Sequence, residues 1–337
     1  MRVAVLGTGL IGGSIAAGLR ELGHVVVGWD PDPAHAATAE TRGLIDSVAD
    51  DRAGAIAGAD LVVLAGPPAA VIAGVGELST PALVVDVAGV KVPVLAAAAG
   101  RRFVGTHPMA GREHGGPEHA SAGLFRGAAW VVVTDGADPA DLATVEGLVE
   151  ALGAIPVHMT AGRHDAAVAA ISHLPQVVAG ALLGHAATEA DRLELAAGSF
   201  RDLTRVALSD PEAWSQLLVA NAAEVGPQLR ELSDRLGAIA AVVEAADSSA
   251  LRSALAESRE RRRSLAPPVV AVSVILEDRP GELGRVGTAL AESRVDVRDL
   301  QLRHGRHGGG GVLTLSVRPG EAETLAVALA DQGFELA

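Results

Sequence analysis

Residues 2–23 read RVAVLGTGLIGGSIAAGLRELG, and this stretch decides the fold of the N-terminal part. A short apolar run, a glycine turn and an amphipathic segment ending at Gly23 predict a strand, a turn and a helix. The turn from Gly7 to Gly12 fits the pattern G-x-G-x-x-G, and Asp30 ends the next apolar run 18 residues further on. Between a strand and a helix, this pattern is typical of a dinucleotide-binding fold.

Each residue type in this turn has a physical role in binding a dinucleotide. Gly7 permits the tight turn, Gly9 lets the backbone approach a pyrophosphate, and Gly12 lets the helix pack closely on the strand. Asp30 is expected to accept hydrogen bonds from ribose hydroxyls and to repel a 2′-phosphate, which predicts NAD rather than NADP. The alternative is a ligand-free glycine turn in which Asp30 only caps its strand. The predicted cofactor site consists of Gly7, Thr8, Gly9, Leu10, Ile11, Gly12 and Asp30.

The rest of residues 1–159 alternates short apolar runs with Ala-rich, helix-like segments. The runs are too uniformly apolar to leave one face in water, which indicates a parallel sheet covered by helices on both sides. We therefore predict an α/β fold with a Rossmann-type doubly wound parallel sheet. The later apolar runs are 61–64, 83–87, 103–105, 130–133 and 155–157.

Two further domains are predicted. Strand-like runs are missing from residue 160 to about 264, so residues 160–266 are expected to form an all-helical domain. Its first helix, about Arg163 to Ala190, is apolar around much of its circumference, which favours burial against another helical surface such as a second subunit. Residues 267–337 read as strand, helix, strand, strand, helix and short final strand, which predicts a small ferredoxin-like α+β domain.

Composition limits the classes of function. The chain of 337 residues has a formal net charge of −14, and its only dense basic run is 258–263, which argues against a nucleic-acid partner. The sequence has no Cys, which excludes disulfides and thiolate metal sites and suits a reducing cytoplasm. The uncharged stretch from Val3 to Leu19 contains five glycines, so we predict no membrane-spanning helix there or elsewhere.

A second glycine-rich stretch, THPMAGREHGG at 106–116, follows the predicted short strand RFVG at 102–105. In a parallel sheet it lies at the carboxyl end of a strand, where doubly wound folds bind their ligands. Pro108 restrains the backbone beside His107, so this imidazole is the predicted general base facing a nicotinamide. The alternatives are a surface histidine and a zinc site. Metal is not predicted, because the four candidate ligands match no standard zinc spacing; these are His107, His114, Glu118 and His119.

Five motifs in combination resemble the bacterial prephenate dehydrogenase family. They occur in that family's order and cover residues 1 to about 235. From about Val269 the chain resembles an ACT domain, the small amino-acid-sensing module, with DRPGELGRV at 278–286 as its first-turn pattern. The five motifs are GLIGGS at 9–14, DVAGVK at 86–91, GTHPMAGRE at 105–113, ISHLPQ at 171–176 and GSFRDLTRVALSDPEAW at 198–214.

The resemblance implies a homodimeric enzyme of tyrosine biosynthesis that converts prephenate and NAD to 4-hydroxyphenylpyruvate, carbon dioxide and NADH. It makes His107 the catalytic residue that takes the proton of the ring hydroxyl, and Arg205 a ligand of a substrate carboxylate. It also places His173, Glu113 and Trp214 at the substrate pocket. Without the resemblance these residues are a solvated Arg, an interhelical His, a surface carboxylate and a core aromatic.

Three other functions stay open. Arogenate dehydrogenase acts on the same ring with an amino group in place of the side-chain ketone, and nothing in the sequence separates the two. A hydroxyacid dehydrogenase commonly uses a Lys on its helical domain, and residues 160–264 contain none. A non-catalytic sensor would keep NAD and amino-acid binding without the chemistry.

One position departs from the family pattern, Gly-Ser-Val-Lys. This chain has Ala88-Gly89-Val90-Lys91, and the family's Ser hydroxyl hydrogen-bonds the catalytic His. Gly89 therefore leaves His107 without that partner, and we expect water or another group to replace it.

In ACT domains, ligands bind at the loop after the first strand. Here that loop contains Asp278, Arg279, Pro280 and Gly281, and the resemblance implies an aromatic amino acid, tyrosine, as an inhibitor. The alternative is a module that only assists dimerisation.

Overall fold

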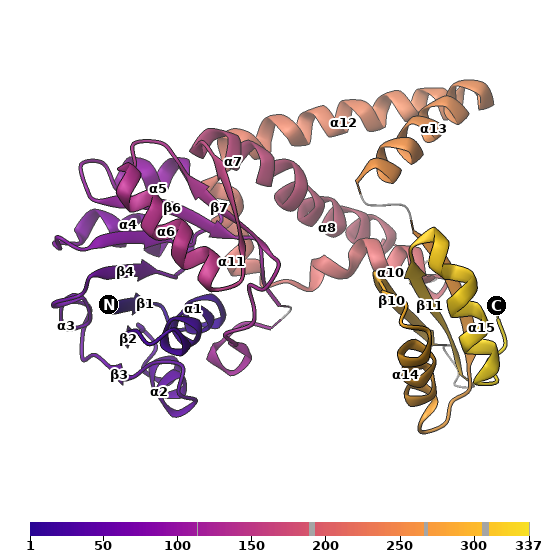
Figure 1. Cartoon of the computed structure of the whole chain (residues 1–337). Coiled ribbons are helices and arrows are strands. Elements are labelled where there is room, and N and C mark those ends of the chain that lie inside the picture. Colours follow the sequence, from indigo (N-terminus) through magenta and orange to yellow (C-terminus); the bar gives the residue numbers. More distant parts are fainter. Residues whose placement is uncertain (113, 189–192, 266–268, 305–309, 337) are drawn as a thin grey trace. The chain divides into compact units, whose positions relative to one another are not determined.

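The computed structural model describes residues 1–112, 114–188, 193–265, 269–304 and 310–336. The chain divides into two compact units, Met1–Ser233 and Asp234–Ala337, and each is described by itself (Figure 1).

An eight-stranded sheet forms the centre of the first unit, with strand order β3-β2-β1-β4-β5-β6-β7-β8. Neighbouring strands pair in parallel except for β6 and β7. The predicted doubly wound sheet is thus confirmed. The strands are β1 Arg2–Leu6, β2 Val25–Trp29, β3 Ser47–Val48, β4 Leu61–Leu64, β5 Leu83–Asp86, β6 Phe103–Pro108, β7 Ala129–Val133 and β8 Ile155–Met159.

The antiparallel pairing of β6 and β7 corrects the prediction of a wholly parallel sheet. A parallel neighbour needs a crossover connection, usually a helix. The described part of the connection from β6 to β7 contains one short 3₁₀ turn, Pro117–His119, and no crossover helix. His107 and Pro108 accordingly lie in the antiparallel ladder, opposite Val131 and Trp130, rather than in a turn.

Helices cover both faces of the sheet, as the uniformly apolar strands predict. Alternate residues of β1 enter two separate cores: Val3 and Val5 pack with α1, α2 and α6, whereas Ala4 and Leu6 pack with α3, α4 and α5. The helices are α1 Leu10–Glu21, α2 Pro33–Thr41, α3 Arg52–Ile56, α4 Pro68–Glu77, α5 Val92–Ala97 and α6 Pro139–Ala151.

The segment after β8 is helical, as predicted, but its first helix is not regular. A π-helical turn, η2, interrupts it immediately before Leu174 and Pro175. Pro175 has no N–H to donate and its ring crowds the preceding turn, so the wider π pattern relieves the conflict. The elements are α7 Ala161–Val168, η2 Ala169–His173, α8 Leu174–Ala186, α10 Gly198–Thr204, η3 Arg205–Leu208, α11 Pro211–Ala220 and α12 Ala222–Glu244.

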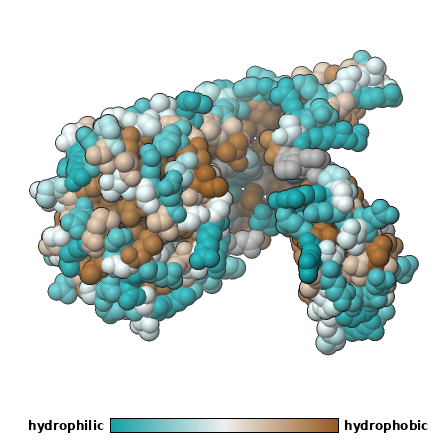
Figure 2. All heavy atoms as spheres, viewed as in Figure 1, coloured by the Kyte–Doolittle hydropathy of each residue, from teal (hydrophilic) through white to brown (hydrophobic). Residues whose placement is uncertain are grey.

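The helical run Ala161–Ala186 is long and apolar enough to cross a membrane by length and composition alone. One such helix is weak evidence, because a core helix passes the same test. Only 22% of its most apolar window is buried within the chain. Figure 2 shows apolar residues, in brown, reaching the molecular surface among hydrophilic ones.

The second unit contains a small antiparallel sheet with strand order β10-β11-β9. The order strand, helix, strand, strand, helix is as predicted, and the final strand is a single bridge from Leu336 to Val274. One face of the sheet packs on helices α14 and α15. The elements are α13 Ser248–Ser264, β9 Val270–Leu276, α14 Glu282–Ser293, β10 Asp299–His304, β11 Gly311–Val317, η4 Pro319–Glu321 and α15 Ala322–Asp331.

Candidate active site

The glycine turn lies between β1 and α1, and its glycines are required for different reasons. Gly7 has φ +100°, and a Cβ there would lie 2.4 Å from the carbonyl oxygen of Ala65. A Cβ at Gly12 would lie 1.9 Å from the carbonyl oxygen of Gly7. A Cβ at Gly9 would meet nothing within 4 Å. Packing therefore demands Gly7 and Gly12, while Gly9 leaves open space for a ligand at the helix N-terminus.

Asp30 ties the end of β2 to this turn. Its Oδ2 accepts hydrogen bonds from the Thr8 backbone N–H (2.6 Å) and hydroxyl (3.2 Å), and its Oδ1 accepts one from the Asp32 N–H (3.0 Å). An ionised carboxylate has about four acceptor sites, so capacity for a further hydroxyl is left. Leu10 and Ile11 are half-buried in the first turn of α1.

A pocket of about 530 Å³ opens at this edge of the sheet. Glycine backbone, the Trp29 ring, two carboxylates (Asp30 and Glu77) and Arg52 line it. The glycine backbone and Asp30 fit the phosphate and adenosine parts of a dinucleotide. Lining residues include Gly7, Gly9, Trp29, Asp30, Pro31 and His35.

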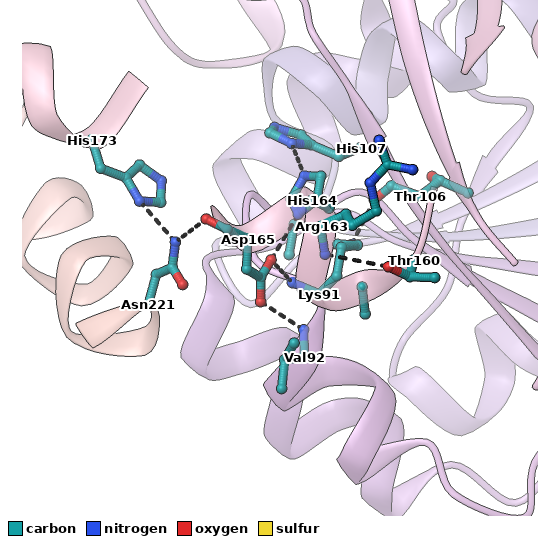
Figure 3. Close-up of polar contacts among 12 residues, drawn as sticks. Lys91, Val92, Thr106, His107, Thr160, Arg163, His164, Asp165, His173 and Asn221 are labelled. Atoms are coloured by element: carbon teal, nitrogen blue, oxygen red, sulfur yellow. Dashed lines mark hydrogen bonds and ion pairs between the residues drawn. The ribbon is translucent and has the colours of Figure 1, made fainter. Parts of the chain in front are cut away.

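His107 lies near the end of β6, partly exposed, and contacts a second histidine (Figure 3). Its Nδ1 is 2.9 Å from Nε2 of His164, and the two rings meet edge to face with centroids 5.1 Å apart. Nδ1 of His164 is in turn 2.7 Å from Oδ1 of Asp165. His164 and Asp165 are buried. A continuous chain of hydrogen bonds thus runs from the sheet edge into α7.

Backbone groups after β5 hold the inner end of this chain. The Asp165 carboxylate accepts the N–H of Lys91 at Oδ1 (2.7 Å) and that of Val92 at Oδ2 (2.8 Å). Thr160 caps the start of α7 by accepting the Arg163 N–H (3.3 Å). The cap fixes where α7 begins and hence which residues of its first turns face the sheet.

Lys91, the only lysine in the sequence, is 1% exposed. Its ammonium group donates to the carboxylate of buried Asp86 and to the carbonyl oxygen of Thr106 (2.6 Å). Burial lowers the pKa of Lys91 and raises that of Asp86, and the pairing opposes both shifts. The pair anchors the backbone beside His107 and puts a positive charge behind it.

The surroundings keep the His107 imidazole neutral. Burial, followed by the positive charge of Lys91 and the neighbouring His164 and His173, holds the pKa of His107 well below its usual 6.5. A neutral imidazole near pH 7 has a lone pair free to accept a proton.

His173 is buried beside the same chain of bonds. Its Nδ1 lies 3.2 Å from Nδ2 of Asn221, which also donates to the carbonyl oxygen of Asp165 (2.9 Å). Its ring meets the half-buried Trp214 on α11 edge to face at 6.1 Å. Burial lowers the pKa of His173. The helical segment is therefore attached to the His107 region through buried polar groups.

The remaining predicted residues of the first unit are Arg205, Glu113 and the histidines after β6. Arg205 begins η3 and is exposed. Glu113 lies outside the described residues. His114 and His119 have ring centroids 5.5 Å apart, and among the residues that the structure describes no group of three or more His, Asp or Glu could hold a metal ion.

In the second unit, the turn between β9 and α14 contains Asp278, Arg279, Pro280 and Gly281, all exposed. Arg279 pairs with Glu282 (2.7 Å) and Glu277 (3.1 Å), and Gly281 has φ +96° at the start of α14. Glycine tolerates this left-handed conformation, so the turn leads directly into the helix.

Sequence reasoning missed His164, Asp165, Lys91 and Asn221 as members of the site. The available signal was the His-Asp pair placed just after Thr160, a helix cap, in an otherwise apolar helix. At Gly89, a Cβ would lie 2.9 Å from Cδ1 of Leu217 and 3.8 Å from Cε1 of His107. Leu217 thus restricts the space of the family's Ser, while His164 contacts His107 from another side.

The glycine turn marks a nucleotide-binding domain, and the helices joined to it hold a neutral, partly exposed histidine at the sheet edge. Together these features define a dinucleotide-dependent dehydrogenase. Residues 15–158 match the family described as prephenate dehydrogenase, nucleotide-binding domain, and residues 160–257 match prephenate dehydrogenase, dimerization domain. The chain belongs to the prephenate dehydrogenase family.

Individual relatives agree with this family. A probable prephenate dehydrogenase of Streptomyces niveus is 34% identical over 96% of this chain and 96% of its own length. The crystal structure of Aquifex aeolicus prephenate dehydrogenase with hydroxyphenyl propionate and NAD+ has a TM-score of 0.74 and 28% identity, covering 79% of this chain and 98% of that one. Synechocystis arogenate dehydrogenase has a TM-score of 0.70 and 30% identity, covering 79% and 100%.

Proposed function

We propose that this chain is a prephenate dehydrogenase, which converts prephenate and NAD to 4-hydroxyphenylpyruvate, carbon dioxide and NADH. The observation that carries the proposal is the position of His107, which is partly exposed at the sheet edge and contacts buried His164 through its Nδ1. Its surroundings also lower its pKa, which favours the neutral imidazole that a base requires. Because His164 occupies its Nδ1, Nε2 is the nitrogen left to accept the proton of a substrate hydroxyl.

In the proposed reaction, His107 takes one proton from the substrate and later returns it. NAD, when bound, supplies the acceptor for the hydride that leaves the hydroxyl-bearing ring carbon. His107 takes the hydroxyl proton at Nε2 as that carbon becomes a carbonyl. Loss of the ring carboxylate as carbon dioxide makes the ring aromatic and leaves an oxyanion. His107 returns its proton to this oxygen, so the overall reaction neither releases nor consumes a proton.

The binding roles follow from residue chemistry. Gly7, Thr8, Gly9, Leu10, Ile11, Gly12 and Asp30 would hold NAD at the turn between β1 and α1. Arg205 would bind a substrate carboxylate, of which prephenate has two, through its planar guanidinium. His173, Trp214 and Glu113 would complete the substrate pocket, and the contact between His173 and Trp214 supports their shared location.

Arogenate is the second candidate substrate, since the similarity to an arogenate dehydrogenase is comparable. The test is purified protein with NAD and either prephenate or arogenate, followed by NADH absorbance. Oxidation of prephenate is expected, and the ratio of kcat/KM for the two compounds assigns the preference. The proposal fails if neither compound is oxidised.

We also propose three domains, residues 1–159, 160–266 and 267–337, in a homodimer that works in the cytoplasm. The family matches at 15–158 and 160–257 support the first boundary, and the absence of Cys from the sequence suits the cytoplasm. Large apolar side chains on the helical segment support dimerisation, since a second subunit would cover them: Ile171 is 68% exposed, Leu208 91% and Val219 75%. Light scattering should give twice the chain mass.

Residues 267–337 are proposed to be an ACT domain that binds tyrosine at Asp278, Arg279, Pro280 and Gly281 and inhibits the enzyme. The strand and helix order and the antiparallel sheet support this proposal. Inhibition requires that tyrosine bind two states of the enzyme with different affinity. Tyrosine should therefore inhibit the full chain and not a chain ending before Val269. A full chain that tyrosine does not inhibit would refute the proposal.

A further inference from the structure

We propose that His164, backed by Asp165, positions His107 and receives the positive charge that forms when His107 takes the substrate proton. This inference rests on the proposed function, since it concerns the same proton. It also answers what supports His107 where Gly89 has no hydroxyl.

In the proposed arrangement of the resting enzyme, each ring carries one proton. Asp165 can only accept when ionised, and it lies 2.7 Å from Nδ1 of His164, so that nitrogen donates. In that arrangement, the lone pair on Nε2 of His164 accepts the hydrogen bond from Nδ1–H of His107 at 2.9 Å. His107 is thereby held in the tautomer whose Nε2 carries a lone pair, as a base requires.

The same hydrogen bonds allow the positive charge to move from His107 to His164 by proton transfer. When the substrate O–H bond breaks and an N–H bond forms at Nε2 of His107, its Nδ1 proton moves to Nε2 of His164. His107 becomes neutral again, and His164 becomes an imidazolium beside the Asp165 carboxylate. The two moves reverse when the proton returns to the product oxygen. Asp165 takes no proton in this scheme, and its carboxylate also accepts the N–H groups of Lys91 and Val92.

The charged surroundings favour this transfer. Lys91, on the β5 side, faces His107 with its positive charge, although Asp86 partly offsets it. His173, on η2, contributes to the lowered pKa of His107, and exposed Arg163 precedes His164 on α7. Asp165 is in contact with His164 and not with His107. Positive charge is therefore better placed on the inner histidine, next to the carboxylate, than on the outer one.

The first test is activity of the full-length enzyme with three variants. His164→Leu removes both the hydrogen bond and the proton site, and kcat should fall about 10- to 100-fold with KM changed less than about threefold. His164→Gln keeps an acceptor but cannot take a proton, so kcat should fall less. His158→Gln is the matched control, because His158 is exposed and pairs only with Glu146 among the described contacts. Wild-type kcat in either His164 variant would overturn the proposal.

The pH profile separates charge sharing from simple repulsion. If His164 accepts the charge, removing it makes protonation of His107 harder, and the acid limb of kcat/KM in His164→Gln moves to lower pH. If His164 acts only as a like charge, removing it makes protonation easier, and the limb moves to higher pH. A move to higher pH, or no move, would overturn the proposal.

A readout independent of turnover is the tautomer of each ring, measured on the wild-type chain by NMR with 15N-labelled histidine. His107 and His164 should each carry their single proton on Nδ1. A doubly protonated His164 at neutral pH would overturn the proposal. If the wild-type protein oxidises neither prephenate nor arogenate, the proposed function fails, while the tautomers still decide the arrangement of the two histidines.

Discussion

The glycine turn and the His107 chain of hydrogen bonds lie at the same edge of one sheet but are built in opposite ways. The turn is one continuous stretch, and its shape is set by backbone φ angles and by space that a Cβ would fill. The histidine chain combines β6, α7, the segment after β5 and the junction of α11 and α12, and side chains set its geometry. A site formed by local backbone can be recognised from adjacent residues in the sequence. A site formed by side-chain contacts depends on residues that are far apart in the sequence and meet only in the fold.

The strongest contrast between the two regions should come from His107→Asn. Loss of a general base typically costs about 10²- to 10⁴-fold in rate, so kcat should fall by that factor. NADH affinity, measured by fluorescence titration, should change less than about threefold, because the glycine turn is untouched. A variant that keeps more than about a tenth of wild-type kcat would contradict the role of His107.

The buried ion pair behind His107 should matter for stability more than any surface pair. Lys91→Met leaves the Asp86 carboxylate buried without its partner and should lower the free energy of unfolding by about 3–5 kcal/mol. Arg20→Met, which breaks a pair with Asp46 that is about one-third exposed, should cost at most about 1 kcal/mol. Urea unfolding measures both, and equal losses would show that burial of the pair is irrelevant.

Two glycine substitutions test the backbone site. Gly12→Ala should cost about 1–3 kcal/mol of folding free energy, because its Cβ would overlap the carbonyl oxygen of Gly7. Gly9→Ala should cost well under about 1 kcal/mol, because nothing lies within 4 Å of its Cβ. Both should weaken NAD binding in a calorimetric titration. Unchanged NAD affinity in Gly9→Ala would contradict a ligand at that position.

The smallest expected effect is the pH response. Because the pKa of His107 lies well below 6.5, kcat/KM should stay on its plateau at pH 6.5 and fall only at lower pH, as the base becomes protonated. The unfolded chain binds that proton more readily than the folded one, so the free energy of unfolding should also decrease as pH falls below about 6.5. A rate that has halved by pH 6.5 would contradict the lowered pKa.

This contrast explains what could be predicted from sequence. The sheet, the glycine turn and the placement of His107 at a strand end follow from periodicity and from glycine spacing. The antiparallel β7 could not be foreseen, because Ala129–Val133 is as apolar as a parallel strand, and only its missing crossover helix distinguishes it. His164 and Asp165 could not be assigned to the site from sequence, because their partners His107 and Lys91 lie 57 and 74 positions away in the chain.

The π-helical turn also escaped prediction, and it matters for the site. In a regular α-helix, residues eight positions apart, such as Asp165 and His173, lie about 80° apart around the axis. Each residue of the wider π turn Ala169–His173 rotates less about the axis, so the angle between Asp165 and His173 becomes smaller. His173 thereby approaches the face of Asp165, where Asn221 contacts both.

The burial of the only lysine has a practical chemical consequence. An amine-reactive ester needs an accessible, uncharged amine, and Lys91 is enclosed and paired with Asp86. Lys91 should therefore stay unlabelled in the folded chain. A label located at Lys91 by mass spectrometry would report that the sheet edge behind His107 had opened, so this residue can serve as a site-specific probe of local unfolding.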